Sequence, residues 1–383
     1  MKQLEFLNKA KRHLSWKWYQ LHVTTRVFLW DSMKSRSLKS VLNASCLHLE
    51  RFSPALQSDD PIFSNPDIQA QLNMEREEYL YRVQGKIVVE PEFGYVILKP
   101  FTIIDLALPG SQMVRDPKAR QFFSGVPSFR SVMKGQPVVK VPSVITFHFI
   151  FDSNYYHFYM DVMTRLKLLD DYGIDQNIPI LVSARLASQP FFQQITQSGS
   201  LSKRKWIVQD GFFLETEEII FAKCDVGCRE SLDFFLDSFD GAQAVTSQSR
   251  RLFLTRNAQV GRNIVNMDQL QPILDRFGFE VIDAGEMTVE EQMTIFSQAG
   301  CVIGIHGAAL TNIVYRRNGS LKLLEIFLPE EAPLFYYVLA KTYDFEYDYI
   351  LGTASQNKTR HAPFCVDPSL LESKLVRMFQ SAS

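Results

Sequence analysis

The feature that most constrains the fold is a regular alternation of short apolar runs and amphipathic segments in the second half of the sequence. Apolar runs with the length and composition of buried strands occupy 251–255, 279–282, 301–304 and 321–327, and helix-like patterns lie between them. Strands that alternate with helices in this way predict a parallel sheet with helices on both faces. We therefore expect a doubly wound α/β unit in this half of the chain.

Helix boundaries in the same half are marked by specific residues. The helix expected over 266–277 is followed by Gly278, which suits the left-handed position that often ends a helix. Thr288 and Glu291 have the spacing of a capping box, in which each side chain bonds the backbone of the other. This pair predicts the start of the next helix. A further short helix is expected over 308–315.

The first half has a different pattern. Short alternating apolar runs, separated by turn residues, predict several strands over 84–150. A helix is expected from Asn154 to Asp171, with Gly173 ending it. Further strands are expected at 178–183, 205–210 and 218–223. This half is therefore expected to combine strands and helices as well.

The length of 383 residues exceeds what one ordinary hydrophobic core holds, so two domains are expected. Hydrophobic residues make up 46% of the chain and charged residues 22%, a balance typical of globular proteins. A polar stretch at 239–250 is the expected boundary between the domains. The expected units are a basic helical extension and linker at 1–75, an α/β domain at 76–240, a second at 241–355, and a tail with a final helix at 356–383.

Charge is unevenly distributed along the chain. The net charge is -1, which excludes a general polyanion binder, and no nucleic-acid partner is expected. Residues 1–40, however, contain nine Lys or Arg and two acids, together with Trp16, Trp18 and Trp30. A basic segment with tryptophans is suited to peripheral contact with an anionic membrane. The alternative is a solvated helical extension that packs its aromatic side chains on the main body.

The remaining composition favours a protein of the cytoplasm. No run of about 18 apolar residues is present, so no transmembrane helix is expected, and the first residues lack the pattern of a signal peptide. Five cysteines, an odd number in a chain of this length, do not indicate a disulfide framework and favour a reducing compartment. If residues 1–40 contact a membrane, the expected location is peripheral, on the inner face of the plasma membrane.

The stretch GIHGAALTN, residues 304–312, joins an expected strand to an expected helix. In a doubly wound sheet ligands bind outside the carboxyl ends of the strands, and small residues at a helix start let backbone N–H groups approach an anion. The alternative is a tight turn whose histidine is bonded internally. The candidate nucleotide-binding residues of this stretch are His306, Gly307, Ala308, Thr311 and Asn312.

Other strand ends of the same half contribute charged residues. Arg256 follows the first strand directly, with Arg262 shortly after it, and guanidinium groups suit bidentate contact with phosphate. Glu325, near the end of the last strand, is placed to accept hydrogen bonds from ribose hydroxyls. The alternatives are surface arginines and an ion pair between the glutamate and a nearby arginine.

A third cluster lies on the helix of the first half. His157 and Asp161 are spaced i, i+4 and share one helix face, an arrangement that suits a general base and its orienting partner. Asn154 and Arg165 extend the same stripe and are candidate substrate-binding residues. The alternative is a polar helix face packed against the neighbouring domain.

Four segments containing these clusters, in this order, resemble glycosyltransferase family 61, a family linked to capsular polysaccharide biosynthesis. The resemblance runs from about residue 145 to 328. Thr164 and Ala309 depart from it, since family members usually have Pro and Gly there. The segments are NYYHFYMDVMTRL, RLFLTRNAQVGRNIVN, EEQMTIFSQAGCVIGIHGAALTNIVY and GSLKLLEIF.

The resemblance implies a GT-B architecture of two Rossmann-like domains. The C-terminal domain would bind a nucleotide sugar, with a UDP-sugar favoured, and the N-terminal domain would hold a glycan or lipid-linked glycan acceptor. Transfer would invert the anomeric centre with Asp161 or His157 as the base, and Arg256 and the amides of 306–309 would stabilise the leaving diphosphate. No metal and no other cofactor is expected.

Two other functions were weighed against this one. An epimerase or dehydrogenase on a similar sheet would need a dinucleotide-binding fingerprint, which the sequence lacks. A non-catalytic scaffold of a polysaccharide assembly complex, binding carbohydrate or nucleotide, would be expected to have lost residues of the site. Because all three clusters are present, the enzyme is favoured over the scaffold.

Overall fold

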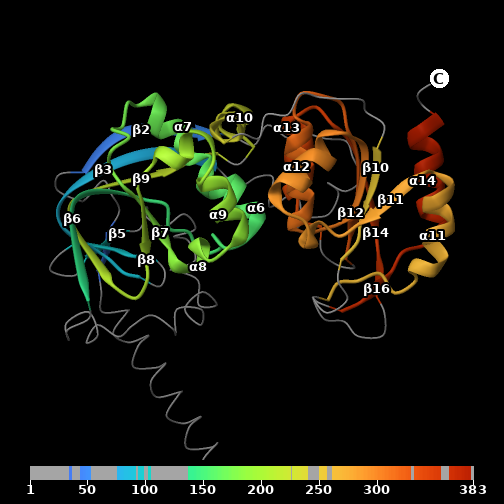
Figure 1. The fold of residues 1–383 in the computed structure, drawn as a ribbon, viewed down its shortest axis with the longest axis horizontal. Helices are drawn as coiled ribbons and strands as arrows, with labels where there is room; N and C mark the ends of the chain where they lie inside the picture. The colour runs from blue at the N-terminus through green and yellow to red at the C-terminus, as the bar shows by residue number, and fades with distance from the viewer. Residues whose placement is uncertain are drawn as a thin grey trace, which may run out of the picture.

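The computed structural model places two α/β bodies side by side, each with its own large sheet (Figure 1). The described residues are 34–36, 44–52, 76–91, 94–98, 102–104, 137–225, 227–239, 250–256, 261–328, 332–354 and 362–380. Residues 1–33 and 53–75, on which the expected membrane contact and linker fall, lie outside these ranges. Among the described helices, none is long and apolar enough to cross a lipid bilayer.

The sheet of the first body has nine strands and mixed polarity. Their order is β1-β5-β4-β3-β9-β6-β7-β8, with β2 also paired to β3. Strands β6, β7, β8 and β9 form a parallel set, whereas β3 runs antiparallel to β2, β4 and β9. The strands are β1 (Lys34–Arg36), β2 (Ala44–Phe52), β3 (Arg76–Val89), β4 (Val96–Leu98), β5 (Thr102–Ile104), β6 (Val138–Thr146), β7 (Ile180–Ser183), β8 (Trp206–Gln209) and β9 (Phe213–Lys223).

Helices cover the face of this sheet that is turned toward the second body (Figure 1). Alternation along β9 explains this: Ile220 and Ala222 pack with the helices, while Ile219 and Phe221 belong to a separate cluster on the other face. The helices are α6 (Tyr155–His157), η5 (Phe158–Met163), α7 (Arg165–Asp171), α8 (Ala184–Ala187), α9 (Pro190–Thr196), η6 (Gly199–Lys203) and α10 (Arg229–Ser238).

The sheet of the second body has five strands, all parallel, in the order β11-β10-β12-β13-β14. The short strands β15 (Thr353–Ala354) and β16 (Phe364–Cys365) form a separate antiparallel pair. This order confirms the doubly wound sheet predicted for the second half, with one strand more than expected. The five strands are β10 (Arg250–Leu254), β11 (Phe279–Ile282), β12 (Ala299–Ile305), β13 (Lys322–Phe327) and β14 (Glu346–Leu351).

Helices lie on both faces of this parallel sheet. On the outer face α11 (Met267–Arg276) and α14 (Pro368–Gln380) pack together, and both contribute leucines to the cluster that covers β12 and β13. On the other face, α12 and α13 lie toward the first body (Figure 1). The elements of this inner face are η8 (Ala284–Glu286), α12 (Val289–Ser297), η9 (Ala308–Arg316) and α13 (Phe335–Thr342).

The predicted helix signals of the second half are confirmed. Thr288 accepts a hydrogen bond from the Glu291 amide while the Glu291 side chain accepts from the Thr288 amide, which is the expected capping box. Gly278 has a φ of 69° after α11. The helix expected over 308–315 is present as η9, although it is a 3₁₀ helix.

Two expectations for the first half need correction. The first sheet is mixed and so is not a simple Rossmann-like sheet, because the long antiparallel strand β3 runs through its middle. Residues 44–52, assigned to a helical extension, instead form β2, which is paired with β3 from Ala44 to Phe52. The alternation of side chains in 44–52 is typical of a strand, but the basic composition of the preceding residues favoured a helical extension instead. The other proposed domain limits stay predictions.

The two bodies share one hydrophobic cluster. It contains Phe158 and Phe235 from the first body and Phe296 and Ile313 from the second. Polar contacts cross the same interface: the Tyr155 hydroxyl donates to Asn312 Oδ1 at 2.9 Å. A packed core therefore sets the relative position of the two bodies, and side chains of both bodies form the interface between them.

Candidate functional site

A pocket lies at the point where the strand order of the second sheet reverses. From β10 the chain passes to β11 on one side and later to β12 on the other, so the connections that leave the carboxyl ends of the neighbouring strands β10 and β12 run in opposite directions. A pocket of about 320 Å³ opens there, lined among others by Arg256, Asp283 and Gly307. Such a switch point is where open α/β sheets bind their ligands. The predicted location of the nucleotide site therefore coincides with a cavity.

Two arginines lie at this end of the sheet, and neither forms an ion pair with an acid among the described residues, although Asp283 lines the same pocket as Arg256. Arg256 lines the pocket, is partly buried, and makes no hydrogen bond or ion pair with another described residue. Burial and the nearby Arg262 lower its pKa. Arg262 has a left-handed φ of 59°, and its buried Nε has no hydrogen-bond partner among the described residues. An unpaired pair of guanidinium groups is an arrangement that an anionic ligand stabilises.

Gly307 lets Arg256 lie against the backbone of the turn. A Cβ at position 307 would stand 3.2 Å from Arg256 Nη1. The φ of Gly307 is 172°, which is extended backbone, so the requirement for glycine here is one of space. Ala308 and Ala309 line the same pocket and begin η9. Gly307 therefore leaves room for the guanidinium of Arg256, whereas the expected approach of the backbone N–H groups to an anion stays a prediction.

His306 is held by a buried carboxylate. Its Nδ1 lies 2.6 Å from Glu325 Oε1, and Tyr347 donates its hydroxyl to Glu325 Oε2 at 2.8 Å. Glu325 is fully buried in β13, and burial raises its pKa. The expected contact between Glu325 and ribose is therefore replaced by a pair with His306. The carboxylate instead fixes the ring of His306, which is enclosed by Phe327 and Tyr336.

A second histidine–carboxylate pair comes from the first body. His157 Nδ1 lies 2.7 Å from Asp161 Oδ2, as the i, i+4 spacing predicts. Both side chains are about one-fifth exposed, 21% and 19%. Asn154 accepts from the amides of Tyr156 and His157 and thereby caps the helix. A π-helical segment, η5, carries Asp161 within this helix, a feature frequent at functional sites.

Three other candidate residues are buried and have structural contacts. Arg165 is 1% exposed, and its Nε donates to the Asp161 carbonyl at 2.7 Å. Asn312 donates to Gln292 Oε1 at 2.6 Å and accepts from Tyr155. Thr311 is fully buried beside the phenol of Tyr336. In these positions they support the site and do not line the pocket, unlike the ligand contacts expected for them.

The two histidine–carboxylate pairs meet at one aromatic ring. The ring centroid of Phe335, the first residue of α13, lies 6.2 Å from that of His157 and 5.9 Å from that of His306. The cluster on the first body and the cluster on the second are therefore parts of a single site. Phe335 was not predicted as a site residue, and no helix was expected over Phe335–Thr342.

Acidic residues of the pocket were also missed. Asp283 follows β11 and accepts from the Gly285 amide at 2.9 Å, and Glu286 lines the pocket beside it. An acid after the second strand is where doubly wound sheets hold a ribose. The signal was available, because the strand expected over 279–282 ends directly before Asp283.

A second pocket of about 270 Å³ adjoins the first, sharing Gly285, Ala308 and Ala309 with it. Its other walls come from both bodies and include Tyr155, Phe191 and Met287. Its lining is more apolar than that of the first pocket. The two together form a slot along the ends of β10, β11 and β12.

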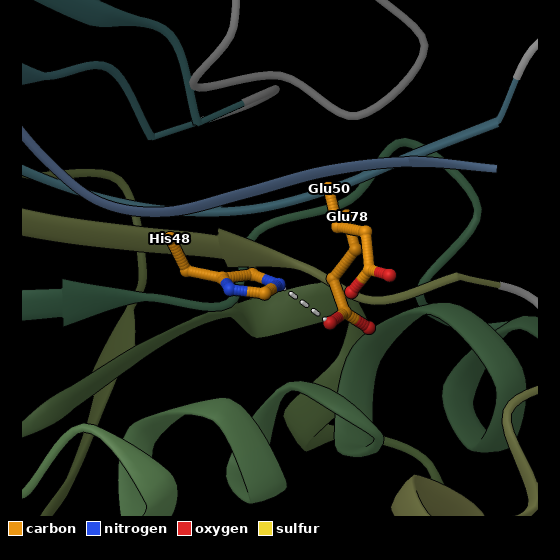
Figure 2. Close-up of side chains that lie close together, drawn as sticks. All are labelled: His48, Glu50 and Glu78. Carbon is orange, nitrogen blue, oxygen red and sulfur yellow. Dashed lines mark hydrogen bonds and ion pairs between the residues drawn. The ribbon is translucent and has the colours of Figure 1, made fainter.

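Among the described residues, one group of side chains is close enough to hold a metal ion. His48, Glu50 and Glu78 lie together on β2 and β3, with the His48 ring directed toward Glu78 (Figure 2). His48 already bonds Glu78 Oε1 at 2.8 Å and the Tyr172 hydroxyl at 2.7 Å, and Glu78 also accepts from the Asp225 amide. The group belongs to the first sheet and shares no residue with either pocket.

The geometry agrees with a comparison against known families. Residues 155–322 match the sequence model of the family described as glycosyltransferase 61. No curated protein matches the chain. The matched residues run from α6 to the first residue of β13 and so include His157, Asp161, Arg256 and His306, the residues that the structure brings together. The resemblance to glycosyltransferase family 61 inferred from the four sequence segments is therefore confirmed over residues 155–322.

Proposed function

We propose that the protein transfers a sugar from a nucleotide sugar, with a UDP-sugar favoured, to a glycan or lipid-linked glycan in the synthesis of a surface or capsular polysaccharide. The observation that carries the proposal is the position of Arg256. It lines the switch-point pocket without a hydrogen bond or ion pair to any described acid, and the turn beside it holds His306, which contacts Phe335 as the His157–Asp161 pair does. A cationic pocket and a candidate base thus belong to one site.

On the donor side, the diphosphate would lie against Arg256 and the turn at Gly307. The charge that develops on the leaving nucleoside diphosphate is stabilised by preorganised cations and N–H groups. Arg262 adds a second positive charge, and Asp283 is placed for the ribose hydroxyls. These arginines would neutralise the negative charge of the diphosphate, as a divalent cation does in other transferases. We therefore propose a reaction without a metal.

On the acceptor side, the His157–Asp161 pair would act as the base. Nδ1 of His157 is engaged by the carboxylate, which leaves Nε2 for the acceptor hydroxyl. Nε2 takes the hydroxyl proton as the acceptor oxygen bonds to the anomeric carbon, and the bond to the phosphate oxygen breaks on the opposite face. One displacement of this kind inverts the anomeric centre. His157 is therefore the proposed base and Asp161 its positioning partner.

The arrangement of the two bodies supports a GT-B architecture as part of the proposal. Each body has a sheet, helices of both line the interface, and the candidate residues come from both sides of it (Figure 1). In this assignment, residues 76–240 hold the acceptor and residues 241–355 the nucleotide sugar. Contact of residues 1–40 with the inner face of an anionic membrane would bring a lipid-linked acceptor close.

The test is thermal stability with UDP, GDP, CMP and TDP, each with and without EDTA. A ligand at one hundred times its Kd stabilises the folded state by about 2.7 kcal/mol, which raises the Tm by a few degrees. We expect UDP to raise the Tm in the presence of EDTA and Arg256→Ala to remove the shift. Arg276→Ala, an exposed arginine of α11 on the outer face of the sheet, is the matched control and should keep it.

Other results would change the proposal. A Tm shift with another nucleotide would leave the glycosyltransferase proposal in place and change only the proposed donor. A Tm shift that EDTA abolishes would contradict the metal-independent reaction. Nucleotide binding without hydrolysis or transfer of any sugar nucleotide would indicate a binding scaffold. No shift with any nucleotide contradicts the assignment of the pocket.

A further inference from the structure

An exposed aromatic ring lies between the two histidine–carboxylate pairs. Phe335 is 40% exposed, although its neighbours Leu334 and Tyr336 are buried. Tyr156 stacks against it, with ring centroids 4.9 Å apart and an interplanar angle of 25°. One side of the Phe335 ring is therefore covered by a buried tyrosine, while a large part of the ring remains open to a ligand.

The tyrosine beneath Phe335 has an unsatisfied polar group. The Tyr156 hydroxyl is buried and has no hydrogen-bond partner among the described residues. Burial raises the pKa of Tyr156 well above its usual value, and the nearby Asp161 and Glu325 raise it further. The carboxylates of both pairs are thus electrostatic neighbours of this ring.

The reaction geometry indicates which ligand belongs here. In the proposed function, on which this inference rests, the transferred sugar is bonded to the diphosphate at one face and is attacked by the acceptor from the other. The diphosphate lies on the side of His306 and the base is His157. In this arrangement the sugar would lie beside Phe335, the exposed ring that contacts both histidines.

We propose that Phe335 is the platform against which the transferred sugar packs, and that the sugar is a pyranose with an apolar C–H face. The negative face of an aromatic ring attracts C–H groups, and stacking against a ring fixes a sugar without using its hydroxyls. Tyr156, stacked on the opposite side, holds the platform in place. Phe335 thereby orients the anomeric carbon between the leaving group and the base.

The experiment separates binding of the sugar from binding of the nucleotide. Titration calorimetry is carried out with UDP alone and with UDP-glucose, UDP-galactose and UDP-N-acetylglucosamine, or with the corresponding conjugates of whichever of UDP, GDP, CMP and TDP the wild-type protein binds. For the best conjugate, Phe335→Ala should raise the Kd about tenfold, as expected for roughly 60 Å² of buried apolar surface. The Kd of the free nucleotide should change by less than about twofold.

Two further variants control for loss of folding. Phe335→Tyr keeps a ring at the position and should retain the affinity of the conjugate. Leu370→Ala removes an apolar side chain of similar exposure, 37%, on the distant helix α14, and should change neither Kd. Retained binding of the free nucleotide by Phe335→Ala shows that the pocket is still folded.

Three results would overturn the platform. Equal loss of affinity for nucleotide and conjugate in Phe335→Ala would mean that the ring supports the fold and not the sugar. An unchanged Kd for both, or an increase only in the acceptor KM, would place the transferred sugar elsewhere while the proposed function stands. If the wild-type protein binds none of the four nucleotides, the proposed function fails, and the platform fails with it.

Discussion

Nδ1 of His306 lies 2.6 Å from Oε1 of Glu325, and the glutamate is completely buried in the central part of the second sheet. The same carboxylate accepts a hydrogen bond from Tyr347 on the neighbouring strand. A carboxylate in this position orients the histidine and leaves Nε2 as the ring nitrogen that can act on a ligand. The relationship matters because the sequence pattern had led us to expect a contact between Glu325 and the ribose hydroxyls.

The first prediction concerns Glu325→Gln. We expect transfer to fall by roughly 10- to 1,000-fold, because a glutamine no longer fixes the charge and orientation of His306, a candidate donor to the leaving phosphate. The nucleotide Kd should change little, since Glu325 does not line the pocket. Kinetics and calorimetry on the same preparation measure both quantities. A large loss of nucleotide affinity would return Glu325 to the role of a ligand contact.

The stability of the same variant should depend on pH. Burial raises the folded-state pKa of Glu325 above its unfolded value, so the protonated form is favoured by folding. Its contribution to stability is present below the unfolded pKa and is lost as pH rises through the folded pKa. Glu325→Gln should therefore be more stable relative to the wild type at pH 8 than at pH 4. Urea unfolding at both values checks the sign, and a relative gain at low pH would contradict it.

The second prediction concerns Asp161, the positioning partner of the proposed base His157. Asp161→Asn should lower transfer by about 10²- to 10⁴-fold, the range of a general-base contribution, while the thermal shift with nucleotide is retained. Asp171→Asn is the matched control, because it removes another carboxylate of the same helical run, an exposed one that is paired i, i+4 with Lys167. The control should keep full activity. Full activity in Asp161→Asn itself would remove this pair from the reaction.

The third prediction contrasts two nearby glycines, Gly304 in strand β12 and Gly307 in the turn that follows this strand. An added Cβ at Gly307 would press on Arg256 Nη1, at 3.2 Å, so Gly307→Ala should weaken nucleotide binding severalfold with a nearly unchanged Tm. A Cβ at Gly304 would stand 2.7 Å from Leu310 in the core, so Gly304→Ala should lower the free energy of unfolding by about 1–3 kcal/mol. Calorimetry and urea titration separate the effects. An unchanged nucleotide affinity in Gly307→Ala would show that the Arg256 side chain can move away from the added Cβ without loss of binding.

How far the sequence predicted the structure depended on whether a signal was local. The capping box of Thr288 and Glu291 and the pair His157–Asp161 are fixed by spacing along one helix, and both were predicted. The pair His306–Glu325 joins neighbouring strands, so it required knowledge of the register between β12 and β13. Sequence spacing alone could place Glu325 only near a strand end, which explains why its pair with His306 was not predicted.

The elements that were missed have a related cause. Helix α13 contains Phe335, Tyr336 and Tyr337, and its first residues resemble an aromatic strand more than an amphipathic helix. The burial of Arg165 was equally hidden, because the side chain lies beneath Phe147 and Phe149 of the adjoining strand segment. Such contacts depend on how the helix packs on the sheet. The hydrophobic pattern along the chain does not determine this packing position.

The last prediction concerns the tyrosines that join the two bodies. Tyr155 contacts Tyr159 of the same body and, across the interface, Tyr315, at 3.0 Å and 3.2 Å between hydroxyl oxygens, and burial raises the pKa of Tyr155 to about 12. Because this folded-state value exceeds the unfolded value near 10, the stability that Tyr155 contributes is present below pH 10 and is lost as pH rises toward 12. Urea unfolding of the wild type should therefore show a steep loss of stability between pH 10 and pH 12. In Tyr155→Phe the loss should be smaller, although this variant should be less stable by about 1 kcal/mol at neutral pH, because Asn312 loses a hydrogen bond. An identical alkaline loss in both proteins would show that other groups control it, and that ionisation of this cluster does not loosen the contact between the two bodies.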